Sequence, residues 1–546
     1  MGRIIRICRL APLLLLLQAA QGLAKKDDVP ADSALFWQAQ RSELGGRSAE
    51  ALKSYAQLVG KLPNSIVAAD RLYDTAILQG DFPSALKAAR AQQLADGGDA
   101  TLPLLFFVDA WKRKDWVAAA QATDWLGDGN IFSFMAPILT AWTEVAQGRQ
   151  GIISNADLRD SGLLTFYTYD QLVYLHLANG NIDAAQRKIG SFPGFGDDYA
   201  RHMAISVAEH LGRNGEADYA NSLLDHIGLD GASFSTKPGR FSGDIALSAL
   251  FSRLSDQLEE QGVSDQALGF ARLANWVAPQ DPYGAITLAK RLTEQRQIMQ
   301  ARALLDDISP SRPQWSWALT YRAGLLRDEG RAKEALALVR SARSKKPQSA
   351  ELMLLEAQQL EADKDREGAA EIYRALIAQG GRDGPQNRTV LYKLLLAQTL
   401  YDTSSWDEAK AALEAALKLD SENPQILNML GYGLLERRED VKRGFELVAK
   451  AHRLSPQSAA ITDSLGWGHY LNGEFEKAVP LLEQAVEGAI SDVTINEHLG
   501  DAYWQVGRTI EARYAWRAAS LLAEGDAAER ISSKISLGWT EATAAP

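Results

Sequence analysis

The sequence predicts an all-α protein built from stacked helical hairpins, an α-solenoid. The first observation is a pattern of small residues between Ala459 and Ser520 that is written twice, at a fixed interval. The second is length, because 546 residues are too many for one compact core, whereas a stack gains core with every added unit. The recurring pairs are Gly466 with Gly500, Gly473 with Gly507, Ala478 with Ala512, and Ala485 with Ala519.

Each recurring position has a physical role in a unit of two helices. Gly466 and Ala478 fall where the two helices of one unit touch, and a larger side chain would push them apart. Gly473 begins the turn between the helices, where a residue that tolerates positive φ is favoured. Ala485 lets the helix of the next unit approach closely.

Residues 1–24 have the composition of a Sec signal peptide. Arg3, Arg6 and Arg9 precede an apolar run from Leu10 to Ala20, and small residues lie just before Lys25. The apolar run is shorter than the ~20 residues that span a bilayer. We therefore expect export to a bacterial periplasm without stable membrane insertion after cleavage; the alternatives are an uncleaved N-terminal anchor or a misassigned start.

The only cysteine, Cys8, precedes the apolar run instead of following it. A lipoprotein is acylated on a cysteine after that run, so the sequence does not predict a lipoprotein. The mature chain would contain no cysteine and therefore no disulfide.

Behind the signal, the sequence divides into two repeat regions. An N-terminal solenoid is expected over 32–227, although 128–172 fits the template poorly. Four glycines and Pro238 within 228–243 predict a loop and the best internal boundary. A C-terminal array follows over 244–526, then a capping helix over 527–538 and an unstructured tail from Thr540. The whole chain is expected to hold about 13–14 hairpins.

Composition and motifs argue against several functions. The formal net charge of −11 is unfavourable for a nucleic-acid partner, which needs a basic surface. No catalytic, phosphate-binding or metal-spaced motif appears, so we expect no enzyme activity, no cofactor and no metal. The alternative is an enzyme with its site in the divergent segment 128–172.

Candidate binding residues lie on the first helix of each of the last three units, at positions that face the groove of a solenoid. Aromatic residues that the packing of a repeat does not need are candidates for contact with a partner. The alternative is that these side chains pack against neighbouring units or the cap. The candidate groove residues are Tyr432, Asp463, Trp467, Tyr470, Glu497, Asp501 and Trp504.

The C-terminal motifs resemble those of exported tetratricopeptide-repeat (TPR) envelope proteins of proteobacteria. They are DSLGW at 463–467, NEHLGDAYW at 496–504, and Gly507-Arg508 with Trp516. The resemblance is specific over about 423–520. It implies a right-handed TPR superhelix with no catalytic activity.

Two branches of that family are similar to this chain. One consists of lipoprotein adaptors that present peptidoglycan endopeptidases to a carboxyl-terminal processing protease; the other consists of soluble periplasmic proteins that support the envelope. The absence of a lipoprotein cysteine favours the second. TPR proteins that grip a C-terminal carboxylate use Lys and Asn on the inner face, whereas Asp463, Glu497 and Asp501 would repel one.

We therefore expect a periplasmic scaffold or adaptor for protein partners in cell-envelope maintenance. A periplasmic protease or a peptidoglycan hydrolase is the partner that the resemblance implies. The alternative is a structural subunit of an envelope secretion or polysaccharide-export machine.

Overall fold

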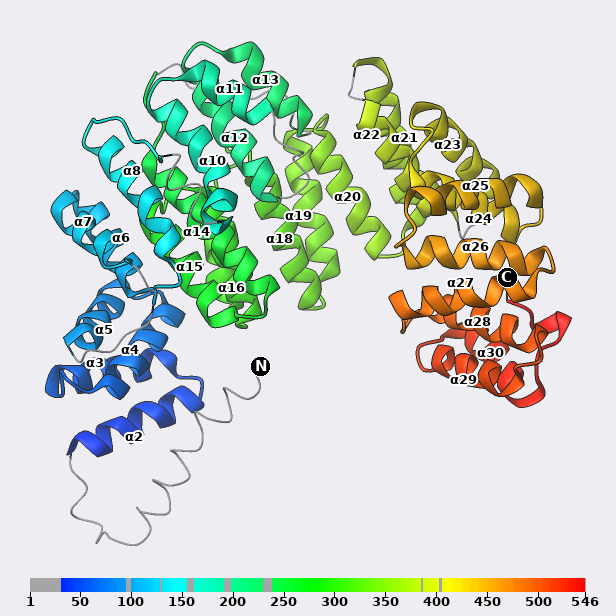
Figure 1. Ribbon diagram of the computed structural model, residues 1–546, viewed down its shortest axis with the longest axis horizontal. Coiled ribbons are helices and arrows are strands. Elements are labelled where there is room, and N and C mark those ends of the chain that lie inside the picture. Colours follow the sequence, from blue (N-terminus) through cyan, green and yellow to red (C-terminus); the bar gives the residue numbers. More distant parts are fainter. Residues whose placement is uncertain are drawn as a thin grey trace, which may run out of the picture. The chain divides into compact units, whose positions relative to one another are not determined.

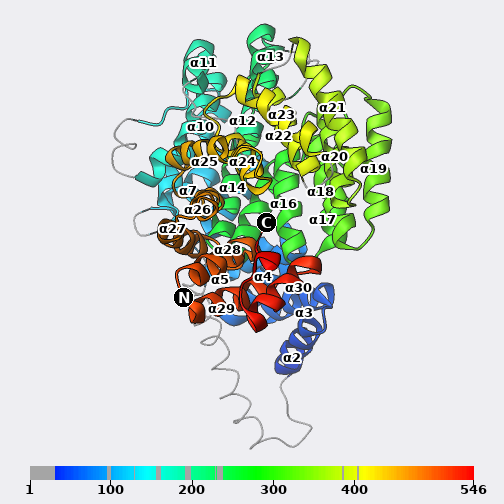
Figure 2. The ribbon, with the colours of Figure 1, turned by 90° about the vertical axis from the view of Figure 1, so that its right-hand side faces the viewer.

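A computed structural model describes residues 31–94, 100–127, 130–154, 162–190, 198–227, 229, 238–383, 386–401 and 405–545. Every regular element within these ranges is helical, as predicted. Consecutive helices pair as antiparallel hairpins (Figures 1 and 2). None of the described helices is both long enough and apolar enough to cross a membrane. The predicted signal peptide, 1–24, lies outside the described residues.

The chain forms two compact units, Met1–Leu325 and Leu326–Pro546. The helices of the first unit are α2 (Ala31–Leu44), α3 (Ser48–Lys61), α4 (Ile66–Gln79), α5 (Phe82–Leu94), α6 (Leu102–Arg113), α7 (Trp116–Asp124), η1 (Ser133–Met135), α8 (Ala136–Ala146), α10 (Gly162–Ala178), α11 (Ile182–Gly190), α12 (Asp198–Arg213), α13 (Ala217–His226), α14 (Gly243–Glu260), α15 (Ser264–Val277), α16 (Pro282–Glu294), α17 (Ile298–Asp306) and most of α18 (Trp315–Asp328).

The second unit contains the end of α18 and the remaining helices. These are α19 (Ala332–Lys345), α20 (Ala350–Ala362), α21 (Arg366–Asp383), α22 (Gln386–Tyr401), α23 (Trp406–Leu419), α24 (Pro424–Glu436), α25 (Val441–Leu454), α26 (Ala459–Leu471), α27 (Phe475–Gly488), α28 (Val493–Gln505), α29 (Thr509–Ser520), α30 (Gly525–Leu537) and η2 (Glu541–Thr543).

Local sequence explains where the hairpins of the second unit begin and turn. The Asn423 side chain accepts hydrogen bonds from the backbone N–H groups of Gln425 and Ile426 in the first turn of α24, and Asp492 accepts one from the N–H of Ile495 in the first turn of α28. Gly473 and Gly507 adopt φ of +74° and +81° at the turns, as the repeat pattern predicts.

The predicted crossings also hold. A Cβ atom on Gly466 would lie 2.8 Å from Leu482 of α27, and one on Gly500 would collide with Trp516 of α29. Both glycines therefore face the second helix of their own unit, and the predicted repeat register is correct.

Unit 1 is not a simple stack in which each hairpin touches only the next. Helix α15 packs on α4 and α6, which lie far earlier in the chain. The buried Arg272 of α15 donates from Nε to the carbonyl of Ile77, at 2.9 Å, and from Nη2 to that of Leu78, at 2.8 Å, at the end of α4. Burial lowers the pKa of Arg272 to about 10.

The boundary between the compact units falls at 325/326 instead of at the predicted loop 228–243, most of which lies outside the described residues. The physical reason is packing across that segment, because α14 contacts α8, α10 and α12. The indole of Trp111, which precedes this segment in the chain, also donates a hydrogen bond of 2.7 Å to Asp244, which follows it. One apolar core consequently runs from Ala76 to Leu325.

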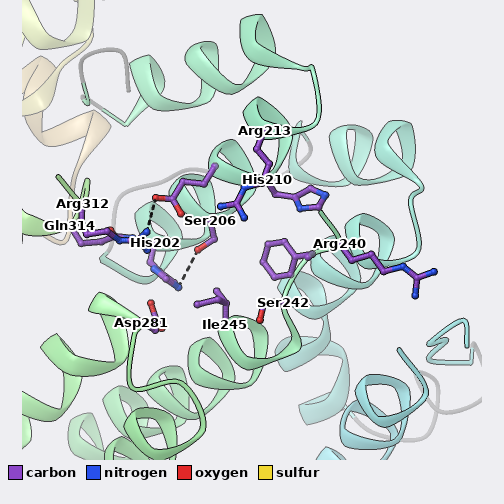
Figure 3. A pocket seen from close by; sticks show the side chains of 12 residues that line it. His202, Ser206, His210, Arg213, Arg240, Ser242, Ile245, Asp281, Arg312 and Gln314 are labelled. Atoms are coloured by element: carbon purple, nitrogen blue, oxygen red, sulfur yellow. Dashed lines mark hydrogen bonds and ion pairs between the residues drawn. The ribbon is translucent and has the colours of Figure 1, made fainter. Parts of the chain in front are cut away.

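Unit 1 also encloses a cavity between α12, the start of α14 and the segment that joins α17 to α18 (Figure 3). Its volume is about 450 Å³, part of which is open to solvent. No residue that lines the cavity belongs to 128–172, the divergent segment of the enzyme alternative.

Candidate functional site

The seven predicted groove residues lie on three successive first helices of unit 2. Tyr432 is on α24; Asp463, Trp467 and Tyr470 are on α26; and Glu497, Asp501 and Trp504 are on α28. The repeat register thus places them on corresponding faces, as expected. Helix α26 packs on both α24 and α28, so the seven belong to one local region of the stack.

Their exposure differs from the expectation. The five from Asp463 to Asp501 are buried, and only Tyr432 and Trp504 are partly exposed. These five side chains pack against neighbouring units and the C-terminal cap, as the alternative to groove binding predicts. A partner could reach them only where that covering is displaced, and their role in partner binding stays a prediction.

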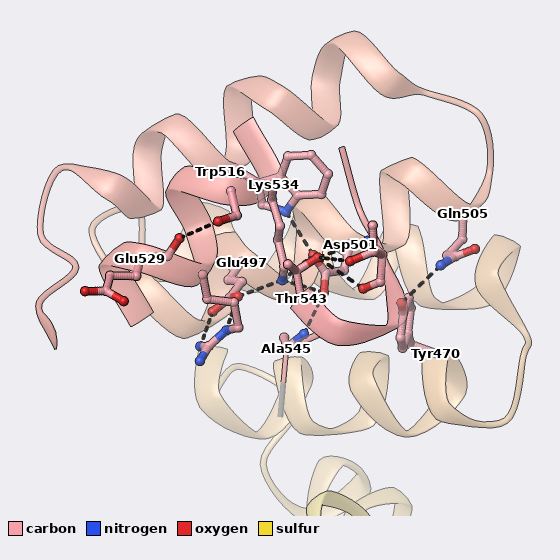
Figure 4. Close-up of polar contacts among 12 residues, drawn as sticks. Tyr470, Glu497, Asp501, Gln505, Trp516, Glu529, Lys534, Thr543 and Ala545 are labelled. Atoms are coloured by element: carbon pink, nitrogen blue, oxygen red, sulfur yellow. Dashed lines mark hydrogen bonds and ion pairs between the residues drawn. The ribbon is translucent and has the colours of Figure 1, made fainter. Parts of the chain in front are cut away.

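The cap supplies cations that neutralise the acidic residues (Figure 4). Lys534 of α30 is fully buried, and its Nζ lies 2.7 Å from Glu497 and 2.7 Å from Asp501. Arg530, one turn earlier, donates two hydrogen bonds of 2.8 Å to Glu497. Two cations one turn apart therefore face two carboxylates one turn apart.

The chain's own C-terminus completes this network. The Trp516 indole donates to Asp501 at 2.9 Å, and the backbone N–H of Ala545 donates to the same carboxylate at 2.9 Å. Residues 541–545 of the tail, which was expected to lack structure, thus fold back onto α28 through η2. Asp501 holds them because it is buried and needs several donors to replace water.

The two carboxylates respond differently to burial. Burial alone would raise the pKa of Glu497, but the hydrogen bonds from Arg530 and Lys534 outweigh it and leave that pKa below its usual value. Burial raises the pKa of Asp501, and Lys534 opposes this effect only in part. Both pKa values depend on Lys534, so this lysine is the electrostatic centre of the cap.

The aromatic candidates form a stack inside the unit. The Trp467 ring lies parallel to Tyr470, with centroids 4.3 Å apart, and parallel to His498, with centroids 3.9 Å apart. His498 is fixed in turn by Asp463, whose carboxylate lies 2.9 Å from Nδ1. Asp463 therefore orients a core histidine.

The two partly exposed candidates, Tyr432 and Trp504, also pack against the apolar core of this region. A Cβ atom on Gly538 would collide with Trp504, and the Arg513 guanidinium lies 5.2 Å from the centre of the Trp504 ring. Burial and the nearby Glu436 raise the pKa of Tyr432, which therefore stays neutral.

A signal for this covering was present in the sequence. Arg530 and Lys534 have the spacing of one helical turn, as do Glu497 and Asp501. The inner-face positions follow from the repeat pattern of a single hairpin. That pattern does not include α30, so it cannot show that α30 carries the positive charges that match Glu497 and Asp501.

A different surface of the last repeat is exposed and apolar. Ile510, Tyr514 and Leu521 follow one face of α29 to its end, with exposed fractions of 68%, 65% and 81%. The guanidinium of Arg517, on the same face, lies 5.9 Å from the centre of the Tyr514 ring. We call these four residues the α29 face.

The preceding repeat differs at the same positions. One repeat earlier, α27 presents Glu476, Pro480, Glu483 and Glu487. That face of the preceding repeat thus carries three acidic residues, as a solvated helix face can. The apolar side chains of α29 are therefore a local feature of the last hairpin.

No group of side chains among the described residues is arranged to hold a metal ion. The surfaces that the C-terminal unit can offer to another molecule are apolar, aromatic and charged faces of helices. Such surfaces suit the binding of another protein.

Residues 394–459 match the tetratricopeptide repeat family. Over 174 residues the chain is 33% identical to a TPR repeat-containing protein of Pseudomonas aeruginosa, a match that covers 32% of this chain and 28% of that relative. The chain thus spans less than a third of the length of this relative.

Two solved structures are similar over most of the chain. The Cut9–Hcn1 hetero-tetramer is 13% identical, with 93% of this chain and 97% of that chain covered and a TM-score of 0.38. Yeast Tom70 is 13% identical, with 93% and 95% covered and a TM-score of 0.37.

Proposed function

We propose that this tetratricopeptide-repeat protein is a non-catalytic scaffold that binds protein partners in the maintenance of the cell envelope. Repeats of this kind form protein-interaction surfaces, because each hairpin adds area to one rigid stack. The partner that we propose is a periplasmic protease or a peptidoglycan hydrolase, the class implied by the sequence resemblance. The observation that carries partner binding is the exposed α29 face.

The α29 face supports partner binding for two physical reasons. Exposed apolar side chains that gather on one surface are unfavourable in water and mark sites of contact with other proteins. Tyr514 and Arg517 are also residue types that contribute strongly to interfaces, because they combine apolar area with polar or charged ends. The acidic counterparts on α27 have neither property.

The test is capture of partners from a periplasmic extract on the immobilised full chain. Ile510→Glu combined with Tyr514→Glu is expected to reduce capture of a protease or hydrolase by about tenfold or more. Both side chains are exposed, so the thermal melting temperature should stay close to wild type.

The matched control is Glu476→Ala with Glu487→Ala, which changes the equivalent face of α27 and should leave capture unchanged. Equal capture by wild type and the α29 variant would contradict the proposed face. Capture of a membrane-embedded secretion complex in place of a protease or hydrolase would favour the machine-subunit alternative.

Export to the periplasm is part of the proposal. It is supported by the three arginines and the apolar run in 1–24. Protein isolated from cells is expected to begin near Lys25, as read by N-terminal sequencing. An intact Met1 on the cellular protein would contradict cleavage.

A further inference from the structure

The cavity in unit 1 is lined by polar side chains from four parts of the chain. His202, Ser206, Glu209, His210 and Arg213 recur at helical spacing along one face of α12. This spacing was the sequence signal for the cavity, because a solenoid helix normally presents small or apolar residues to its neighbours. The other lining residues are Arg240, Phe241, Ser242, Ile245, Asp281, Arg312 and Gln314.

Three arginines and two carboxylates line this cavity, namely Arg213, Arg240 and Arg312 with Glu209 and Asp281. Arg213 and Arg312 both act on Glu209, which lies 3.7 Å from Arg312 (Figure 3). Arg213 has no ion pair with any described residue, and Nε of each arginine lacks a hydrogen-bond acceptor there. Among the described residues the Asp281 carboxylate makes no ion pair with an arginine; it accepts from the Ser248 hydroxyl at 2.7 Å and from backbone N–H groups of α16.

Two neutral groups are also left without partners among the described residues. His202 and Gln314 are each 1% exposed, yet His202 Nδ1 and Gln314 Oε1 make no hydrogen bond. The His202 ring is held in place by stacking on Tyr283, with centroids 4.4 Å apart. Burial lowers the pKa of His202, so the ring is neutral at pH 7 and the cavity's cations are arginines.

The start of α14 also favours an anion in the cavity. Ser242 is the N-cap residue, and its side chain makes no capping hydrogen bond. Ser242 and Ile245 line the cavity, so the first turn of an 18-residue helix lies at its wall. The N-terminus of such a helix favours an anion.

We propose that this cavity binds a small ligand that carries a compact oxyanion, a carboxylate or a phosphate, beside a hydrogen-bond donor. The oxyanion of the ligand accepts hydrogen bonds from Arg213 and Arg312, and the adjacent donor of the ligand donates a hydrogen bond to Gln314 Oε1. Guanidinium groups suit this role because their N–H groups match the oxygens of carboxylate and phosphate. The site is independent of the α29 face and adds small-molecule binding to the proposed scaffold.

The experiment uses the full chain with inorganic phosphate or lactate, a hydroxy-carboxylate with its own donor, against sodium chloride at equal ionic strength. Isothermal titration calorimetry is expected to show saturable binding of one of these ligands at one site. The two arms distinguish a phosphate from a carboxylate. Failure of both to bind or to raise the melting temperature above the chloride control would overturn the proposal.

Substitutions locate the site. Arg213→Gln and Arg312→Gln are each expected to weaken binding at least about tenfold. The control is Arg187→Gln on α11, because Arg187 is an exposed arginine of the same unit that does not line the cavity; it should stay within about twofold of wild type. Wild-type affinity in Arg213→Gln would contradict the assignment.

A measurement on the wild-type chain covers the case of a variant that does not fold. The sequence contains seven histidines, so their ring nitrogens can be followed by nuclear magnetic resonance after selective ¹⁵N labelling. Saturating ligand is expected to shift the signals of His202 and His210. Unchanged histidine signals under conditions of saturation would place the ligand elsewhere.

Discussion

Lys534→Met is expected to destabilise the C-terminal unit by about 3–5 kcal/mol. The wild-type ammonium is fully buried and lies within hydrogen-bond distance of both Glu497 and Asp501. Methionine fills a similar volume but removes the charge, which leaves two carboxylates in a site from which water is excluded. The loss should appear as an earlier transition in urea unfolding, followed by tryptophan fluorescence.

Two companion variants separate charge from packing. Arg530→Met should cost about 1 kcal/mol or less, because the Arg530 side chain is 26% exposed and water can replace part of its ion pair. Adding Glu497→Gln and Asp501→Asn to Lys534→Met should recover part of the loss, since the uncompensated charges are gone. An effect of Lys534→Met below that of Arg530→Met would show that the buried network does not hold the cap.

Trp467→Ala is expected to cost about 3–5 kcal/mol, the range for a buried tryptophan. The ring is fully buried between Tyr470 and His498, so its removal leaves a cavity in the core of the unit. Urea unfolding monitored by far-ultraviolet circular dichroism measures this loss. From the sequence alone, Trp467 was a candidate for partner contact, with packing against neighbouring units or the cap as the alternative.

Tyr514→Ala is the matched control, because Tyr514 is an aromatic residue of the same unit that is exposed. Its removal should change stability by about 0.5 kcal/mol or less. If Trp467→Ala were as stable as wild type, the side chain would be accessible and the predicted groove would regain support as a partner site.

The predictable part of the fold lies in positions that act within one hairpin or between adjacent hairpins. Gly473 and Gly507 were assigned to turns, and Gly466 and Gly500 to helix crossings, and the structure places all four as expected. These assignments succeed because the same local packing recurs in successive hairpins, so the sequence carries each requirement more than once.

The candidate site was less predictable, because exposure depends on what the next segment does. Glu497 and Asp501 were expected to line an open groove, but Lys534 and Arg530 of α30 cover them. Those cations belong to a helix outside the repeat pattern. The pairing between the last repeat and the capping helix occurs only once in the described chain, so a repeating sequence pattern cannot predict it.

The sequence by itself determined the fold class, the hairpin register and the close helix crossings, because each follows from side-chain size at a recurring position. Only the tertiary structure decided that α15 packs on α4 through Arg272 and that the cap fills the acidic face. It also decided that α12, α14 and the segment before α18 enclose a cavity. The reason is that small rotations between successive repeats accumulate along a solenoid. Contacts between distant repeats depend on the sum of those rotations, which no single repeat encodes.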